Sequence, residues 1–200
     1  MKKDLKDQPV VGLNSEEKQF LLRLARRSIR SRIDDSRIED PPVIPEKLRE
    51  KFGTFVTLHF QRRLRGCIGY VEGIKPLYQA VMEMARSAAF EDPRFSPLKK
   101  DELDKCDIEI TVLSPLQRVH SVEQIKVGEH GLMVKQGIKR GLLLPQVAVD
   151  WQWDRKTFLE QTCHKANLPA DCWQNKETEI YLFAGEIFSE EEFQNYNTGE

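Results

Sequence analysis

The chain has 200 residues, enough for one sizeable domain or for two small lobes that share a core. Hydrophobic residues make up 40% and charged residues 32%, a balance that excludes a largely disordered chain. The formal net charge is −1, so no overall field directs the chain toward nucleic acid or an anionic membrane. No apolar run approaches the roughly 20 residues that a membrane-spanning helix needs.

The cysteines give little sign of a metal site or of a disulfide framework. Cys67, Cys106, Cys163 and Cys172 are scattered and form no CxxC pair. Residues 1–8 are charged and lack the apolar segment of a secretion signal. We therefore expect a cytoplasmic protein with reduced thiols, no metal and no membrane association.

The first predicted helix begins at Asn14 or Ser15, because either side chain can cap it. Its apolar residues follow helical spacing along one side, and its arginines mostly take the other side. This basic side is typical of a solvated face, and a nucleic-acid-binding face is the weaker alternative.

A β-hairpin is predicted next. Residues 53–61 alternate between two faces as a strand does, Arg62 and Arg63 mark a turn, and residues 64–71 return as a second strand. Glycines weaken the return strand, and in such a position they usually mark a bulge or a close approach of another group.

The middle of the chain contains the clearest helix. It begins at Pro76, and its apolar stripe continues to Ala88. Residues 91–98 contain two prolines and are predicted to form an ordered loop. A short helix over 101–105 and a strand over 107–113 follow.

The remaining segments complete an α+β pattern. Two short strands are predicted over 132–134 and 142–144. A helix capped by Asp154 extends to Ala166, with Asn167 as its left-handed terminator, and a last strand follows over 178–187. Strands and helices do not alternate strictly. We therefore expect mainly antiparallel sheets with flanking helices rather than a doubly wound parallel sheet.

The segment from Leu64 to Gly69 is the most informative for function. Arg65 and Cys67 are two positions apart in a strand and are expected on one face. Gly66 and Gly69 leave room for a ligand or another backbone to come close. An arginine near a thiol favours the thiolate, so Cys67 is a candidate nucleophile, although a small buried hydrophobe is the alternative.

Several segments together make the chain resemble the AMMECR-one domain family, also called protein A of the AmmeMemoRadiSam system. The matching segments are LRGCIG (64–69), AAFEDPRFSPL (88–98), IEITVLSPLQRV (108–119), HGLMV (130–134), RGLLLPQVA (140–148) and the stretch from Trp153 to Pro169. The similarity extends from about residue 14 to residue 188.

This resemblance implies one domain over residues 13–190, with two lobes and a polar cleft between them. The expected larger lobe combines residues 13–62 with 140–190, and the smaller lobe spans 63–139. The family name implies a shared pathway or complex with Memo-like and radical-SAM proteins, which is an argument by analogy.

Four further residues are candidates for the cleft. Asp92 and Arg94 could offer a carboxylate and a guanidinium there, although Asp92 could equally pair with Arg94 within the loop. His130 is a weaker candidate for a general base, since a turn residue is the simpler reading. Gln146 can both donate and accept hydrogen bonds to a ligand.

Arg65 needs an anionic partner, which could be a ligand or a carboxylate of the fold such as Asp92 or Glu109. No phosphate-binding loop or dinucleotide motif is present in the sequence, and no cofactor is expected.

Two functions of different class follow from these residues. In the first, Arg65 and Arg94 hold a small anionic substrate, Cys67 is the nucleophile, and Asp92 or His130 transfers protons. In the second, the same cleft belongs to a non-catalytic adaptor that binds a small anion, a peptide or a partner protein. Both functions require that the glycine-flanked strand over 64–71 and the twin-proline loop over 91–98 meet and form a cationic hollow open to water. An RNA-associated module that uses the arginines of the first helix is a third, weaker alternative.

Overall fold

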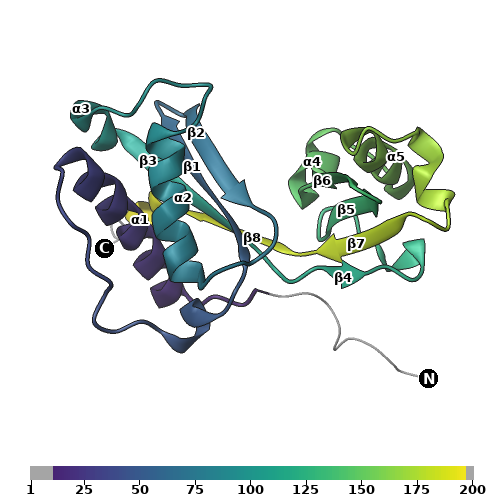
Figure 1. Ribbon diagram of the computed structural model, residues 1–200, viewed down its shortest axis with the longest axis horizontal. Coiled ribbons are helices and arrows are strands. Elements are labelled where there is room, and N and C mark those ends of the chain that lie inside the picture. Colours follow the sequence, from purple (N-terminus) through teal and green to yellow (C-terminus); the bar gives the residue numbers. More distant parts are fainter. Residues whose placement is uncertain (1–10, 197–200) are drawn as a thin grey trace. The chain divides into compact units, whose positions relative to one another are not determined.

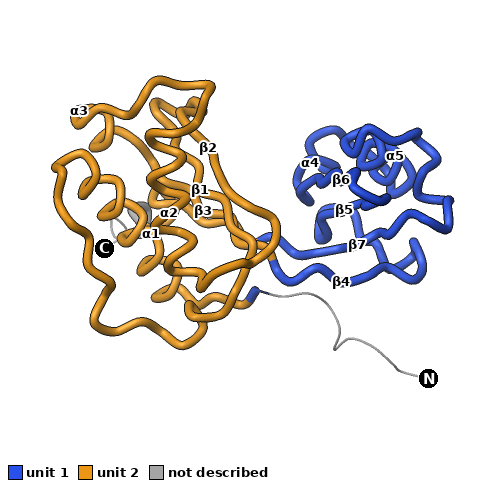
Figure 2. Tube along the Cα trace, in the orientation of Figure 1, with its two compact units in different colours: residues 1–11, 114–185 blue, residues 12–113, 186–200 orange. Residues whose placement is uncertain are grey.

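The computed structural model describes residues 11–196, which form two compact units (Figures 1 and 2). Within this range, unit 2 comprises residues 12–113 and 186–196, and unit 1 comprises residue 11 and residues 114–185. Each unit contains one four-stranded sheet and its own helices. The fold class is therefore α+β with antiparallel sheets, as predicted.

The unit boundaries differ from the expected lobe boundaries. A boundary after residue 62 would fall inside the hairpin of β1 (Gly53–Phe60) and β2 (Arg63–Tyr70), and one after residue 139 would cut the hairpin of β5 (Gly131–Gln136) and β6 (Lys139–Leu143). The strands of each hairpin pair along their length, and these backbone hydrogen bonds keep a hairpin within one unit.

Unit 2 is built on the sheet β2-β1-β3-β8. Its remaining elements are α1 (Ser15–Ile33), η1 (Glu46–Arg49), α2 (Leu77–Phe90), α3 (Lys100–Leu103), β3 (Cys106–Leu113), β8 (Gly185–Ser189) and α6 (Glu190–Tyr196). Helices α1 and α2 pack together beside the sheet (Figure 1). Between these two helices, the buried Ser28 hydroxyl donates to the carbonyl of Met82 at 2.7 Å.

The local signals for α1 are confirmed. Asn14 caps the helix, since its side chain accepts from the Glu17 amide at 2.9 Å and the Glu17 carboxylate accepts from the Asn14 amide at 2.9 Å. The β1–β2 turn lies at Gln61 and Arg62, one residue earlier than expected. Both have positive φ, the conformation that a two-residue hairpin loop requires.

Unit 1 is built on the sheet β4-β7-β5-β6. Its remaining elements are β4 (Gln117–Arg118), η2 (Val122–Gln124), α4 (Pro145–Asp150), α5 (Arg155–Lys165), η3 (Ala170–Gln174) and β7 (Glu179–Phe183). The core between sheet and helices includes Leu132, Val134, Phe158, Leu159 and Leu182. Helix α5 begins at the predicted cap, Asp154, and Asn167 beyond its end has the predicted left-handed conformation.

The strand predicted over residues 178–187 is instead two strands in two different sheets. β7 ends at Phe183, and β8 begins at Gly185. Between them, the Ala184 amide donates to the Ser114 hydroxyl at 2.9 Å, and the Ser114 amide donates to the Ala184 carbonyl at 2.9 Å. The alternating pattern continues through this point, so periodicity alone does not reveal the change of sheet.

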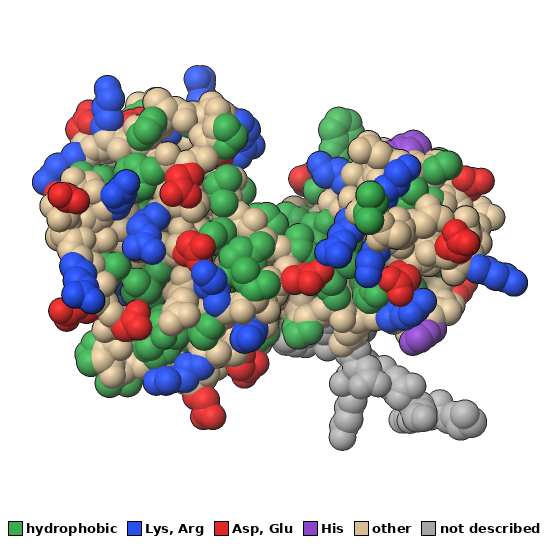
Figure 3. Space-filling view, in the orientation of Figure 1, with side chains coloured by type: hydrophobic (Ala, Val, Ile, Leu, Met, Phe, Trp, Pro, Cys, Tyr) green, Lys and Arg blue, Asp and Glu red, His purple; other side chains and the backbone are tan. Residues whose placement is uncertain are grey.

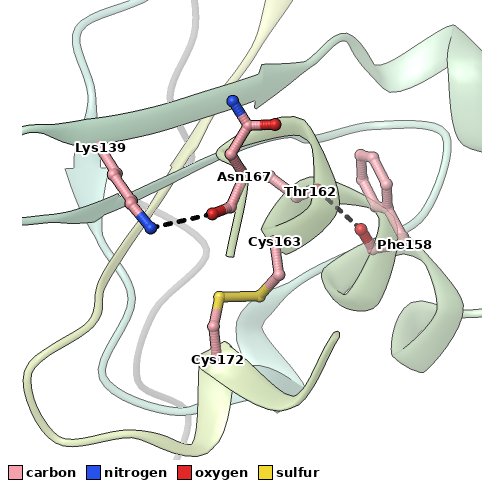
Figure 4. The surroundings of a disulfide bond; sticks show 6 residues. All are labelled: Lys139, Phe158, Thr162, Cys163, Asn167 and Cys172. Carbon is pink, nitrogen blue, oxygen red and sulfur yellow. Dashed lines mark hydrogen bonds between the residues drawn. A yellow bond between two sulfur atoms is a disulfide. The ribbon is translucent and has the colours of Figure 1, made fainter. Parts of the chain in front are cut away.

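The expectation of four reduced cysteines is wrong for one pair. Cys163 at the end of α5 and Cys172 in η3 form a disulfide, with their Cα atoms 5.9 Å apart (Figure 4). Nine positions separate them in sequence, and the turn around Asn167 brings η3 back against α5. Cys67 and Cys106 are free thiols.

Surface charge is mixed. On the face of unit 2 seen in Figure 3, acidic and basic side chains are interspersed. Among the helices of residues 11–196, none combines the length and the apolar character that a membrane crossing requires.

Candidate functional site

Arg65 is the extra residue of a β-bulge in β2. The pairing with β1 passes from Leu58 opposite Gly66 to His59 opposite Leu64, which leaves Arg65 without an opposite residue. The bulge predicted from the glycines is therefore present. It directs the Arg65 side chain toward α3 rather than into an alternating position of the sheet.

The partner of Arg65 is Glu102 on α3, and not Asp92 or Glu109. Its Nε lies 3.0 Å from Oε1 and its Nη2 lies 3.1 Å from Oε2, so two parallel hydrogen bonds join the groups. Hydrogen bonding to Arg65 lowers the pKa of Glu102. The Arg65 side chain is only 11% exposed, which leaves it poorly placed to receive a ligand from solvent.

Asp92 and Arg94 form a second paired group in the loop after α2. The Asp92 carboxylate accepts from Nε of Arg94 at 2.9 Å and from Nη2 at 2.7 Å. The Asp92 side chain is 2% exposed, whereas that of Arg94 is 54% exposed. The Arg94 guanidinium holds the pKa of Asp92 well below its usual range. A carboxylate kept so firmly ionised is poorly suited to exchanging protons near neutral pH.

This pair also closes the outer edge of β2 at Cys67. The Cys67 amide donates to Oδ2 of Asp92 at 2.9 Å, and Nη2 of Arg94 donates to the Cys67 carbonyl at 3.2 Å. An edge strand would otherwise leave both backbone groups unpaired. The strand and the twin-proline loop therefore meet, as predicted, and they meet at Cys67.

Phe95 lies beside both arginines. The centre of its ring is 6.0 Å from the guanidinium carbon of Arg65 and 5.4 Å from that of Arg94. The two glycines of the motif have packing roles. A side chain at Gly66 would overlap the carbonyl of Ala88 in α2, and one at Gly69 would overlap β1.

The side chain of Cys67 lies on the face of the sheet opposite α2. Gly66 faces α2, and successive residues of a strand point to opposite faces. Thr57 of β1 is directly opposite Cys67 and, on its other side, directly opposite Glu109 of β3. Cys67, Thr57 and Glu109 therefore form one row across three strands.

Cys67 is half-buried, and the Thr57 hydroxyl donates to its Sγ at 3.3 Å. The hydrogen bond from Thr57 and the partial exposure of Cys67 distinguish this thiol from one enclosed in the core. Cys106, the other free thiol, lies in the interior of unit 2, and burial raises its pKa. The two free thiols thus differ in exposure and in surroundings.

His130 and Gln146 belong to unit 1, whereas Arg65, Cys67, Asp92 and Arg94 belong to unit 2. His130 is buried, its Nδ1 accepts from the Lys126 amide at 3.2 Å, and burial lowers its pKa. This is the turn-residue alternative named above. Gln146 lies in the first turn of α4, an element that the sequence did not reveal.

Sequence reasoning missed Thr57 and Glu102 as members of the site. Neither carries a local signal, since Thr57 is set by the strand register and Glu102 by the position of α3. Within residues 11–196, no three His, Cys, Asp or Glu side chains are grouped so that they could hold a metal ion.

Two four-stranded antiparallel sheets, each with flanking helices, define the class of this fold. The AMMECR1 family model matches residues 22–188, and this chain belongs to that family. A protein of Thermococcus onnurineus (strain NA1) is 46% identical over 190 residues, which cover 90% of this chain and 93% of that protein.

Other relatives are similarly close. A protein of Methanothermobacter thermautotrophicus is 45% identical over 187 residues, covering 90% of this chain and 97% of that protein. The crystal structure of uncharacterized protein PH0010 from Pyrococcus horikoshii has 44% identity and a TM-score of 0.79 and covers 90% of this chain and 94% of that one. The match to PH0010 extends over most of both chains and supports the α+β fold.

Proposed function

We propose that this protein binds a small anionic ligand at Arg94 and Cys67 of unit 2. The observation that carries the proposal is the state of Arg94. Its guanidinium is fixed by Asp92 and by the Cys67 carbonyl, yet more than half of the side chain is exposed. Among residues 11–196, no hydrogen bond engages its Nη1, which leaves donors for an incoming carboxylate or phosphate.

Of the two arginines expected to hold the anion, only Arg94 has this role in the proposal. Arg65 is largely buried and paired with Glu102, and its guanidinium lies against the ring of Phe95 in the loop. Asp92 compensates the positive charge of Arg94, so the site has little net charge. It would therefore recognise an anion through the fixed direction of the Arg94 N–H groups more than through overall charge. Binding is favoured over catalysis because Asp92 is committed to holding Arg94.

The support for partner proteins is less direct and comes from the family resemblance alone. The family resemblance leads us to include Memo-like and radical-SAM proteins as partners in a shared pathway. Mixing the purified proteins and measuring sedimentation would test a direct complex.

The RNA alternative gains no support from α1, because Arg26 pairs with Glu190 and Arg30 with Asp104 at 2.6 Å.

Alkylation of Cys67 tests the anion site. Iodoacetate carries a negative charge and iodoacetamide carries none, so the ratio of their rate constants measures how the site treats an anion. The rate constant for iodoacetate is divided by that for iodoacetamide, and the result is divided by the same ratio measured for free glutathione. We expect this normalised ratio to be about fivefold lower in Arg94→Gln than in the wild type, which is the effect of one exposed ion pair. Orthophosphate should slow both reagents in the wild type and not in Arg94→Gln.

Arg63→Gln is the matched control, because Arg63 is exposed on the same strand and its loss changes the net charge equally. Arg63→Gln should leave the ratio unchanged, and Arg94→Lys should retain part of the preference for iodoacetate. Protection of the buried Cys106 thiol checks that each variant is folded. A wild-type ratio equal to that of glutathione and unaffected by Arg94→Gln would refute the proposed binding site.

A further inference from the structure

Glu109 is a half-buried carboxylate without a partner. Across residues 11–196, neither a hydrogen bond nor an ion pair engages its side chain. Asp107 lies two positions earlier on the same strand and the same face, and its carboxylate accepts from the Glu191 amide at 2.8 Å. Partly buried charges are normally paired, so Glu109 has unused capacity for a cation or a donor.

The position of Glu109 relates it to the proposed anion site. It occupies the far end of the row that begins at Cys67 and passes through Thr57. Neighbouring strands lie about 4.8 Å apart, so the backbones of Cys67 and Glu109 are roughly 10 Å apart. Arg94 closes the outer edge of the sheet at Cys67. The order along the row is therefore guanidinium, thiol, hydroxyl and carboxylate.

We infer that the ligand is bipolar, with an anionic end at Arg94 and an ammonium end at Glu109. This inference rests on the proposed function, because it assigns the second end of the same ligand. The chemical class is an ω-amino acid or a molecule of dipeptide length, whose charges are far enough apart to span the row. A free α-amino acid is too short, since its ammonium and carboxylate groups are both attached to one carbon atom.

Other ionisable groups on this face are consistent with a cationic end. Asp107 adds a second carboxylate beside Glu109, and His59 is opposite Asp107. Burial raises the pKa of Asp107, and the nearby Glu190 and Glu191 add smaller contributions in the same direction. An ammonium group placed there would be attracted by the carboxylates of Glu109 and Asp107.

Protection of Cys67 from iodoacetamide can test the inference with four defined probes. They are hexanoate, 6-aminohexanoate, hexylamine and glycine. In the wild type, 6-aminohexanoate should give half-protection at a concentration about fivefold lower than hexanoate, the gain of one exposed ion pair. Hexylamine and glycine should protect weakly, because each lacks one end or the required length.

Two substitutions separate the inference from the proposed function. In Glu109→Gln, hexanoate should protect as before, and the advantage of 6-aminohexanoate should disappear. In Arg94→Gln, both probes should lose protection. Glu46→Gln is the matched control, because Glu46 is an exposed carboxylate of the same unit and its loss should change neither value.

The possible outcomes are distinct. Equal protection by hexanoate and 6-aminohexanoate in the wild type would overturn the bipolar ligand and leave the anion site standing. An advantage of 6-aminohexanoate that persists in Glu109→Gln would also overturn it. No protection by either probe would count against the anion site itself. Protection of Cys106 confirms that Glu109→Gln is folded.

Discussion

Replacing Asp92 by alanine should destabilise unit 2 by roughly 1–3 kcal/mol near neutral pH. The substitution removes the acceptor of the Cys67 amide at the sheet edge and of the Arg94 amide in the loop. A backbone donor left without a partner away from water costs about that amount. Arg94 is half-exposed and can turn to solvent, so its lost ion pair adds little to the cost.

The effect should depend on pH in a defined direction. The folded pKa of Asp92 is lowered, so the unfolded chain binds more protons between that value and the unfolded value of about 3.9. Stability from this carboxylate is therefore fully present above about pH 5 and is lost as the pH falls below about 4. The difference between wild type and Asp92→Ala should shrink over the same range.

Urea unfolding, followed by alkylation of the buried Cys106, is a suitable assay for unit 2. Glu91→Ala is the matched control, since Glu91 is an exposed neighbouring carboxylate, and it should change stability by less than about 0.5 kcal/mol. The reasoning would be refuted if Asp92→Ala unfolded at the same urea concentration as the wild type, or if its deficit were independent of pH.

Two further predictions concern unit 1, which contains all three tryptophans, so that their fluorescence follows its unfolding. The double substitution Cys163→Ser and Cys172→Ser should lower the free energy of unfolding of unit 1 by roughly 2–3 kcal/mol, because the disulfide no longer restricts the unfolded chain. A reducing agent should destabilise the wild type by the same amount and should not affect the double variant. Burial lowers the pKa of His130, so the unfolded chain binds more protons below about pH 6.5, and stability should decrease from pH 7 to pH 5. His130→Asn should flatten this dependence, and an unchanged slope would assign it to another group.

Features that depend on short-range signals can be predicted from the sequence. The Asn14 and Asp154 caps, the left-handed Asn167 and the bulge beside Gly66 each depend on a few neighbouring residues, so propensity and turn chemistry are sufficient to predict them. The meeting of the Cys67 strand with the Asp92 loop followed from the motifs and the family resemblance.

The remaining features depend on long-range placement. Arg65 pairs with Glu102, which lies 37 positions later in the sequence on α3. A local sequence pattern cannot show that the fold places α3 beside this strand. Cys163 and Cys172 are joined because a turn reverses the chain between them. The sequence predicts that Gly66 and Gly69 leave room for a ligand or for another backbone, and the alternative of another backbone is the one observed, with α2 at Gly66 and β1 at Gly69.

The most direct test of the anion site is a titration with orthophosphate, followed by NMR of ¹⁵N-labelled protein. The Cys67 amide and the Nε–H of Arg94 both donate to Asp92, so in the wild type both signals should shift together and saturate. In Arg94→Gln, which lacks the guanidinium, the Cys67 amide signal should not shift. Arg63→Gln should behave as the wild type. Small shifts spread over exposed basic residues, or no saturable change at Cys67 and Arg94, would contradict the proposed site.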